Sequence, residues 1–242
     1  MAIVLFTDLG SNDLYVGQVE AVLDRHAPGV RVIHLLHDAP AFNIEASAHL
    51  LAAVITKLPK GHVFMGVVDP GVGTERGAIV MRADGRWFVG PDNGLFAVTG
   101  ARAAARQFWQ ITQIPASAAP SFHGRDLFAP MAAAVATDDF PNGSVRAASG
   151  LQVTLGAADL LEVIYLDHYG NAFTGQRAAG VPTTARVAVA GREVPHARVF
   201  SAVARGEAIW YENSIGLIEI AVNQGSAAQV LGLSVGDAVS VV

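Results

Sequence analysis

The chain has 242 residues, a formal net charge of −5 and a hydrophobic fraction of 52%. That length suits one large domain or two small ones, and the apolar content supports a sizeable core. The acidic balance argues against a general nucleic-acid binder, which would carry a basic face. Cysteine is absent, which excludes disulfides, thiolate nucleophiles and cysteine metal sites. No apolar run approaches the ~20 residues of a membrane span, and the start lacks the basic residues of a signal peptide, so we expect a soluble cytoplasmic protein.

The N-terminal part alternates between strand and helix patterns. Apolar runs at residues 2–7, 30–36 and 63–68 are continuous, which is typical of strands buried on both faces. Between them, polar residues that can cap a helix precede apolar residues at helical spacing. The order predicts an α/β domain with a mostly parallel sheet sandwiched by helices. The expected caps are Ser11 or Asn12 for the first helix and Asn43 for the second.

Farther along, the pattern changes twice. Residues 78–89 indicate a hairpin around A-D-G-R, and residues 127–136 indicate a helix. Residues 138–161 are polar and weakly patterned, so we place a boundary there, with an N-terminal α/β domain at 1–150 and a second domain at 151–242. The second domain has short β-rich runs between Gly, Pro and Asn, which predicts a smaller antiparallel, barrel-like β-domain. These runs are 163–166, 186–190, 208–211, 217–222 and 238–242.

Three acids, Asp8, Asp69 and Asp167, come directly after apolar runs. Open α/β sheets present chemistry at the carboxyl ends of their strands, although Asp is also common there as a turn residue. Asp69 begins the loop D-P-G-V-G-T-E-R, across which we expect it to face Arg76. The alternative is a surface turn with an ion pair worth ~0–1 kcal/mol. His123, in S-F-H-G-R-D, stands between a loop and a helix, and a lone histidine is usually structural.

The second domain contains two polar turns that suit a small-molecule ligand. D-H-Y-G-N-A-F at 167–173 combines an acid, an amide and two aromatic rings, and a purine needs a stacking face and an amide at its edge. N-S-I-G at 213–216 offers a hydroxyl and backbone groups to a carboxylate. Each also has a simpler interpretation as a turn between strands. His34 and His37 are interpreted as strand-end packing, and no histidine–carboxylate spacing indicates a metal site.

Six motifs follow one another along the chain: T-D-L-G-x-x-D (7–13), D-P-G-V-G-T-x-R (69–76), G-P-D-N-G-L (90–95), F-H-G-R-D-x-F-A-P (122–130), D-x-Y-G-N (167–171) and N-S-x-G-x-x-E-I-A (213–221). In this order and spacing they resemble the S-adenosyl-L-methionine hydrolase (adenosine-forming) family, also called SAM hydroxide adenosyltransferases, relatives of fluorinase and chlorinase. The resemblance spans both domains. Members of this family form trimers with each site between the first domain of one subunit and the second domain of its neighbour, so a homotrimer is implied.

The resemblance implies two sets of site residues and no cofactor. Its catalytic set falls on Asp69, Arg76 and His123. Ile215 stands where halogenating relatives carry an arginine, so a substrate carboxylate must rely on Ser214 and backbone groups. The substrate-binding set is Asp8 for the ribose hydroxyls, Asp13, Asp167 and Ser214 for the amino-acid end, and Asn171, Tyr169, Phe173 and Phe200 for adenine.

The implied reaction is attack of water on the ribose 5′ carbon of S-adenosyl-L-methionine, which gives adenosine and methionine. The sulfonium leaves as a neutral thioether, so the difficult partner is water, whose pKa is ~15.7. Arg76 would stabilise the developing hydroxide, while Asp69 and His123 orient it and accept its proton. Two alternatives stay open. A halogenase is disfavoured because Asp69 would repel halide and Gly124 has no hydroxyl, and a non-catalytic adenosine-binding protein would not need the catalytic set.

Overall fold

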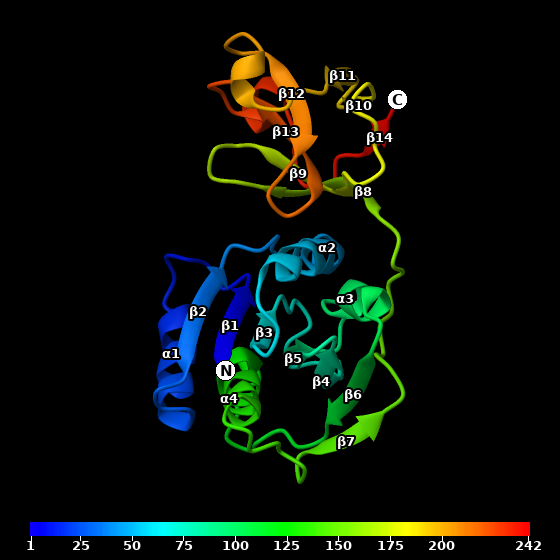
Figure 1. Cartoon of the computed structure of the whole chain (residues 1–242). Coiled ribbons are helices and arrows are strands. Elements are labelled where there is room, and N and C mark those ends of the chain that lie inside the picture. Colours follow the sequence, from blue (N-terminus) through cyan, green and yellow to red (C-terminus); the bar gives the residue numbers. More distant parts are fainter. The chain divides into compact units, whose positions relative to one another are not determined.

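The computed structural model describes residues 1–242, and the chain divides into two compact units (Figure 1). Unit 1 consists of Met1–Leu51 and Leu58–Ala157, and unit 2 consists of Ala52–Lys57 and Ala158–Val242. None of the helices combines the length and the apolar character that crossing a membrane requires.

Unit 1 is built on a seven-stranded sheet with the order β2-β1-β3-β5-β4-β6-β7. β1 is parallel to β2 and β3, and β3 is parallel to β5. β4 is antiparallel to β5 and β6, so β6 runs in the direction of β5, and only β4 and β7 run the other way. The prediction of an α/β fold with a mostly parallel sheet is confirmed. The strands are β1 (Ala2–Thr7), β2 (Arg31–Leu36), β3 (Val63–Val67), β4 (Ala78–Ala83), β5 (Arg86–Pro91), β6 (Arg106–Ile111) and β7 (Val145–Ala148).

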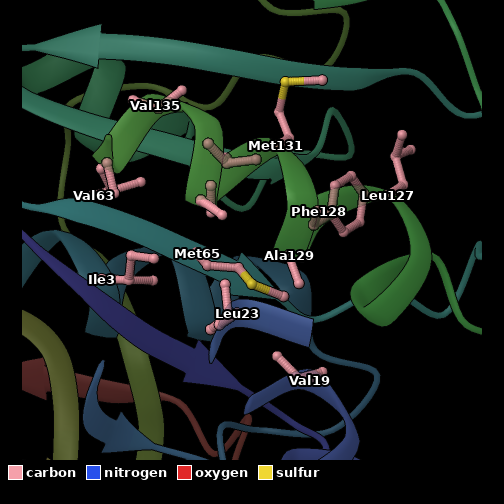
Figure 2. Close-up of a cluster of buried hydrophobic side chains, with 14 of the residues drawn as sticks. Ile3, Val19, Leu23, Val63, Met65, Leu127, Phe128, Ala129, Met131 and Val135 are labelled. Carbon is pink, nitrogen blue, oxygen red and sulfur yellow. The ribbon is translucent and has the colours of Figure 1, made fainter. Parts of the chain in front are cut away.

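Helices α1 and α4 cover one face of this sheet (Figure 1). Val19 of α1 and Val135 of α4 belong to one buried cluster with Ile3 of β1 and Met65 of β3, and Figure 2 shows these side chains together. Both faces of the central strands are buried, which explains their continuous apolar runs. The helical elements of the chain before unit 2's main part are α1 (Tyr15–His26), α2 (Ile44–Val54), the 3₁₀ turn η1 (Ile55–Lys57), α3 (Ala97–Arg102), the π-helical turn η2 (Gly124–Phe128) and α4 (Ala129–Ala136).

On the opposite face, aromatic rings pack where two neighbouring strands approach closely. Phe88 stacks on Phe64 with ring centroids 5.2 Å apart and lies 5.6 Å from Phe96, which directly precedes α3. A Cβ atom added to Gly90 of β5 would lie 2.2 Å from the Gly66 carbonyl oxygen of β3. The motif G-P-D-N-G-L therefore begins with a glycine because no side chain fits between these strands.

The two predicted helix caps differ in outcome. Asn43 caps α2, because its Oδ1 accepts the backbone N–H of Ala46 at 3.0 Å. The expectation of a side-chain cap from Ser11 or Asn12 on α1 is wrong: α1 begins after Leu14, which makes no capping hydrogen bond. The loop before α1 is instead hydrogen-bonded to the chain after β2, through the N–H of Gly10.

We expect Asn43→Ala to lower the free energy of unfolding by about 1 kcal/mol, because it removes the acceptor for an otherwise unpaired helix N–H. Chemical denaturation of the purified variant measures this. Asn43→Ser keeps an oxygen acceptor at the same place and should lose less. Equal losses for the two variants would show that the oxygen acceptor at this position contributes nothing to the free energy of unfolding.

Unit 2 contains two antiparallel sheets, with the orders β12-β13-β9-β8 and β11-β10-β14. Every ladder in them is antiparallel, which confirms the predicted antiparallel β-domain. A single bridge between Glu162 of β8 and Ala238, the residue before β14, links the two sheets, and no continuous ladder closes them into a barrel. The elements are β8 (Leu160–Leu166), β9 (Ala172–Arg177), β10 (Arg186–Val189), β11 (Arg192–Pro195), η3 (Phe200–Ala202), β12 (Ala208–Glu212), β13 (Leu217–Val222), α5 (Ala227–Leu231) and β14 (Val239–Val241).

Candidate active site

Asp8 and Asp69 lie just beyond the carboxyl ends of β1 and β3, at the same edge of the unit 1 sheet. β1 and β3 are parallel neighbours, with Thr7 paired to Val67, and the Asp8 N–H donates to the Val67 carbonyl at 3.0 Å. Parallel strands end at a common edge, so the segments that follow start side by side. Burial raises the pKa of Asp8 to about 6, and the charge of Asp69 adds to the rise. Asp8 is therefore a hydrogen-bond acceptor above about pH 6 and becomes a neutral carboxylic acid below it.

Asp69 and Arg76 face each other across the glycine-rich loop. Arg76 Nε lies 2.9 Å from Oδ1 and 3.0 Å from Oδ2 of Asp69, and Nη2 also donates to Oδ2. Only 4% of the Asp69 side chain and 10% of the Arg76 side chain are exposed. The alternative interpretation as a solvent-exposed surface pair is therefore wrong. Removing one partner of such a buried pair leaves the other charge uncompensated, at a cost of about 3–5 kcal/mol.

His123 joins this pair from a distant part of the chain. Gly73, with φ +79°, lets the loop run against residue 120: a Cβ atom there would lie 2.7 Å from the Pro120 carbonyl oxygen. His123, which is 5% exposed, lies directly before η2. Its Nδ1 is 3.0 Å from Arg76 Nη2. The guanidinium carbon of Arg76 is also 5.2 Å from the ring centroid of Phe128, in a cation–π contact from the end of η2.

The contact with Arg76 determines how His123 carries its proton. An arginine can only donate, so Nδ1 of His123 accepts, and the neutral ring then carries its proton on Nε2. Burial lowers the pKa of His123, and the positive charge of Arg76 lowers it further. The ring is therefore neutral near pH 7. In this tautomer Nε2 donates a hydrogen bond, which does not fit the expectation that His123 accepts a proton from water.

The loop that carries Asp13 is tied to the chain after β2. Thr7 Oγ1 lies 2.9 Å from His37 Nδ1, and the Gly10 N–H donates to the His37 carbonyl at 2.8 Å. His37 is thus a hydrogen-bonding support of this loop, which corrects its interpretation as strand-end packing. Asp13 itself is exposed. The hydrogen bond between Thr7 and His37 was not predicted, because it depends on β1 and β2 lying side by side.

The structure brings the predicted unit 2 residues to one cavity of about 810 Å³. Aromatic rings and polar groups line it, and its lining contains no lysine, arginine or histidine. All six residues that were predicted for this part of the chain take part. The lining residues are Asp167, Tyr169, Asn171, Phe173, Phe200, Tyr211, Asn213, Ser214, Glu219, Val222, Asn223, Gln224 and Gly225.

Asp167 holds the turn that carries Tyr169 and Asn171. Its Oδ1 accepts the backbone N–H groups of Tyr169 at 2.9 Å and Asn171 at 2.8 Å, and its Oδ2 accepts from Asn171 Nδ2 at 3.0 Å. Gly170, with φ +81°, sits where a Cβ atom would overlap Ser226 Oγ. The turn interpretation and the ligand interpretation of this motif are therefore compatible: the acid positions the amide that faces the cavity.

Seven further lining residues were not assigned a role from the sequence, and three of them, Tyr211, Asn213 and Glu219, carry polar groups deep in unit 2. Tyr211 Oη donates to Glu219 Oε1. Asn213 Oδ1 accepts the N–H groups of Ile215 at 3.1 Å and Leu217 at 3.0 Å. One signal could have found Glu219: it is the single charged residue in the apolar run L-I-E-I-A-V.

A buried Asp–Arg–His set at the carboxyl edge of an α/β sheet is an arrangement for chemistry on a small molecule. Models of the SAM hydroxide adenosyltransferase N-terminal and C-terminal domains match residues 3–144 and 161–240. The chain belongs to the SAM hydroxide adenosyltransferase family.

Individual proteins agree with this assignment. An (R)-S-adenosyl-L-methionine hydrolase of Thermus thermophilus is 39% identical, over 97% of this chain and 96% of that protein. A fluorinase of Nocardia brasiliensis is more distant, with 24% identity over 99% of this chain and 96% of its own. The crystal structure of an uncharacterized conserved protein from Thermotoga maritima superposes with a TM-score of 0.89, at 31% identity and 99% coverage of both chains.

Proposed function

We propose that the protein hydrolyses S-adenosyl-L-methionine to adenosine and L-methionine. The observation that carries the proposal is the buried, hydrogen-bonded set of Asp69, Arg76 and His123 in unit 1. A cavity with aromatic walls and a polar floor in unit 2 supports it, because a purine needs both kinds of surface. The relative from Thermus thermophilus is named for this hydrolysis of the (R) form of the substrate.

In the proposed mechanism, water attacks the ribose 5′ carbon in line with the departing sulfur. The C–S bond breaks with both electrons going to sulfur, which leaves as the neutral thioether of methionine. Arg76 supplies positive charge beside the developing hydroxide, and the Nε2–H of His123 orients the oxygen. Asp69 is then the group left to accept the proton, since a carboxylate has lone pairs beyond those that Arg76 occupies. Positioning in line contributes much of the acceleration, up to ~7–11 kcal/mol.

The substrate-binding roles follow the two units. Asp8 is assigned to the ribose hydroxyls, for which its ionised form above about pH 6 is the acceptor. Asp13, Asp167 and Ser214 are assigned to the amino-acid end of the substrate. Adenine is assigned to Asn171, with Tyr169, Phe173 and Phe200 as stacking faces.

We propose that the protein works in the cytoplasm as a homotrimer whose sites each combine unit 1 of one subunit with unit 2 of a neighbour. The support is that the charged set and the aromatic cavity belong to different units. The most exposed of the large apolar side chains are Phe42 at 82%, Tyr169 at 76% and Leu14 at 69%.

Incubation of the purified protein with S-adenosyl-L-methionine, followed by chromatography, tests the reaction. We expect adenosine and methionine in equal amounts, at a rate that EDTA does not change. The sequence has no cysteine and no histidine–carboxylate spacing for a metal. Inactivation by EDTA that one divalent ion restores would overturn the metal-free mechanism. A 5′-halogenated nucleoside formed only with added halide would instead identify a halogenase, and binding without any product would identify a sensing protein.

A further inference from the structure

Glu219 is a buried carboxyl group that the proposed mechanism does not use. It lies on β13, the interior strand next to β12 and β9, and is 3% exposed. Its neighbours along the strand, Ile218 and Ile220, enter the apolar core of unit 2. Because side chains alternate along a strand, Glu219 points to the other face, where the cavity lies.

The strand register places Glu219 between two aromatic rings. On one side it pairs with Tyr211 of β12, and on the other with Phe173 of β9. Tyr211 also packs against Phe200, with ring centroids 5.4 Å apart and nearly perpendicular planes. The side chains that flank the carboxyl group across the sheet are therefore aromatic.

Within the chain, no basic side chain forms an ion pair with Glu219. The cavity lining also holds no basic side chain. Burial raises the pKa of Glu219 above its usual range. Hydrogen bonds from Tyr211, Asn213 and Asn171 oppose this rise, and the negative charge of Asp167 adds to it. A buried carboxylate without a cationic partner is unfavourable, so its ionised form gains most from a cation that enters the cavity.

The other polar groups of the cavity serve the turns and the acids. Asn213 Oδ1 accepts two backbone N–H groups of the following turn, and the Asn213 side chain lies close enough to Glu219 to lower the pKa of that carboxyl group. Two acids and aromatic faces form the surroundings that a positively charged group prefers, because ring faces carry negative partial charge.

We propose that Glu219, held by Tyr211, makes the unit 2 cavity selective for a positively charged ligand over a neutral one of the same shape. This rests on the proposed function, in which the substrate carries a sulfonium in addition to the α-ammonium of its amino-acid end, and the products retain only the α-ammonium. Glu219 is thus a specificity-determining residue that favours the sulfonium substrate over the corresponding thioether. Because the positive charge disappears during the reaction, the same interaction weakens once the bond to sulfur is broken.

The test uses two ligands that the protein cannot hydrolyse in the proposed way. One is S-adenosylhomocysteine, which is a neutral thioether, and the other is the analogue in which a carbon bearing a primary ammonium replaces the sulfonium. Isothermal titration of the full-length protein measures both dissociation constants. We expect the wild type to prefer the ammonium analogue, and Glu219→Gln to lose about tenfold or more of that preference. The control Glu212→Gln removes the same charge from an exposed position at the end of β12 and should keep it.

Steady-state kinetics separate a role in substrate selectivity from a purely structural role of Glu219. Glu219→Gln should raise KM for S-adenosyl-L-methionine without lowering kcat, because the lost interaction stabilises the charged ground state more than the transition state. If Glu219→Gln does not fold, Tyr211→Phe removes only the hydroxyl that supports the ionised carboxyl group, and it should also reduce the preference. An unchanged preference in the folded variants overturns this inference alone. Failure of the wild type to bind either ligand overturns the proposed function.

Discussion

Replacing Asp69 with asparagine is expected to lower kcat by about 10²–10⁴-fold, the usual range for removal of a positioned proton acceptor. Asparagine keeps the shape of the side chain but cannot take a proton from water. Its amide also presents a donor to the guanidinium of Arg76, which disturbs the hydrogen bonds that now hold that group. Adenosine binding should survive, because the residues assigned to adenine lie in unit 2. Initial rates and adenosine titration of the same preparation measure the two effects separately.

The matched control is Asp24→Asn, which removes the same charge from an exposed position on α1. It should leave both rate and binding unchanged. Because the Asp69–Arg76 pair is buried, thermal unfolding must be recorded for each variant, and retained adenosine binding shows that the cavity is intact. If a folded Asp69→Asn protein lost binding and turnover to the same extent, Asp69 would be a substrate-binding residue and not the proton acceptor.

Mixing two inactive variants is expected to restore activity. Asp69→Asn spoils the unit 1 half of a site, and Asn171→Ala spoils the unit 2 half. If each site combines unit 1 of one subunit with unit 2 of its neighbour, random co-refolding of equal amounts pairs two intact halves at about one quarter of the sites. The mixture should then recover roughly a quarter of the wild-type rate from two nearly inactive parents. The rate of the mixture relative to each parent measures this.

The comparison has a built-in control, because refolding each variant alone provides the baseline without complementation. If every site lies within one chain, each site in the mixture keeps one defect, and the activity stays at the level of the parents. A protein that light scattering shows to be monomeric, and that is fully active at nanomolar concentration, would also exclude shared sites.

Local patterns in the sequence were enough to predict the central strands of unit 1 and the antiparallel character of unit 2. Val63–Val67 is buried throughout, so its apolar run is visible without knowledge of its neighbours. The strands β6 and β7 at the far edge of the sheet were not predicted, because few of their residues are buried. Only Ile111 is buried in β6, and β7 lies within the stretch 138–161 that lacks any apolar period. A strand that is mostly exposed carries little hydrophobic signal.

The same division applies to the candidate site. Asp69 and Arg76 are seven residues apart on one glycine-rich loop, so their pairing could be expected from spacing alone. The tautomer of His123 could not, because it depends on an arginine 47 residues away in the chain. Burial also had to come from the structure, and burial is what separates the Asp69–Arg76 pair from a weak surface contact.

In unit 2, local turns could be predicted from the sequence, but neighbours across the strands could not. The sequence by itself determined that residues 167–173 and 213–216 form polar turns with aromatic neighbours, since turn residues and rings are local features. Only the tertiary structure decided that Tyr211, Glu219 and Phe173 stand in one row across three strands. The physical reason is that cross-strand neighbours follow from pairing and register, and a shift of one residue would turn Glu219 into the apolar core.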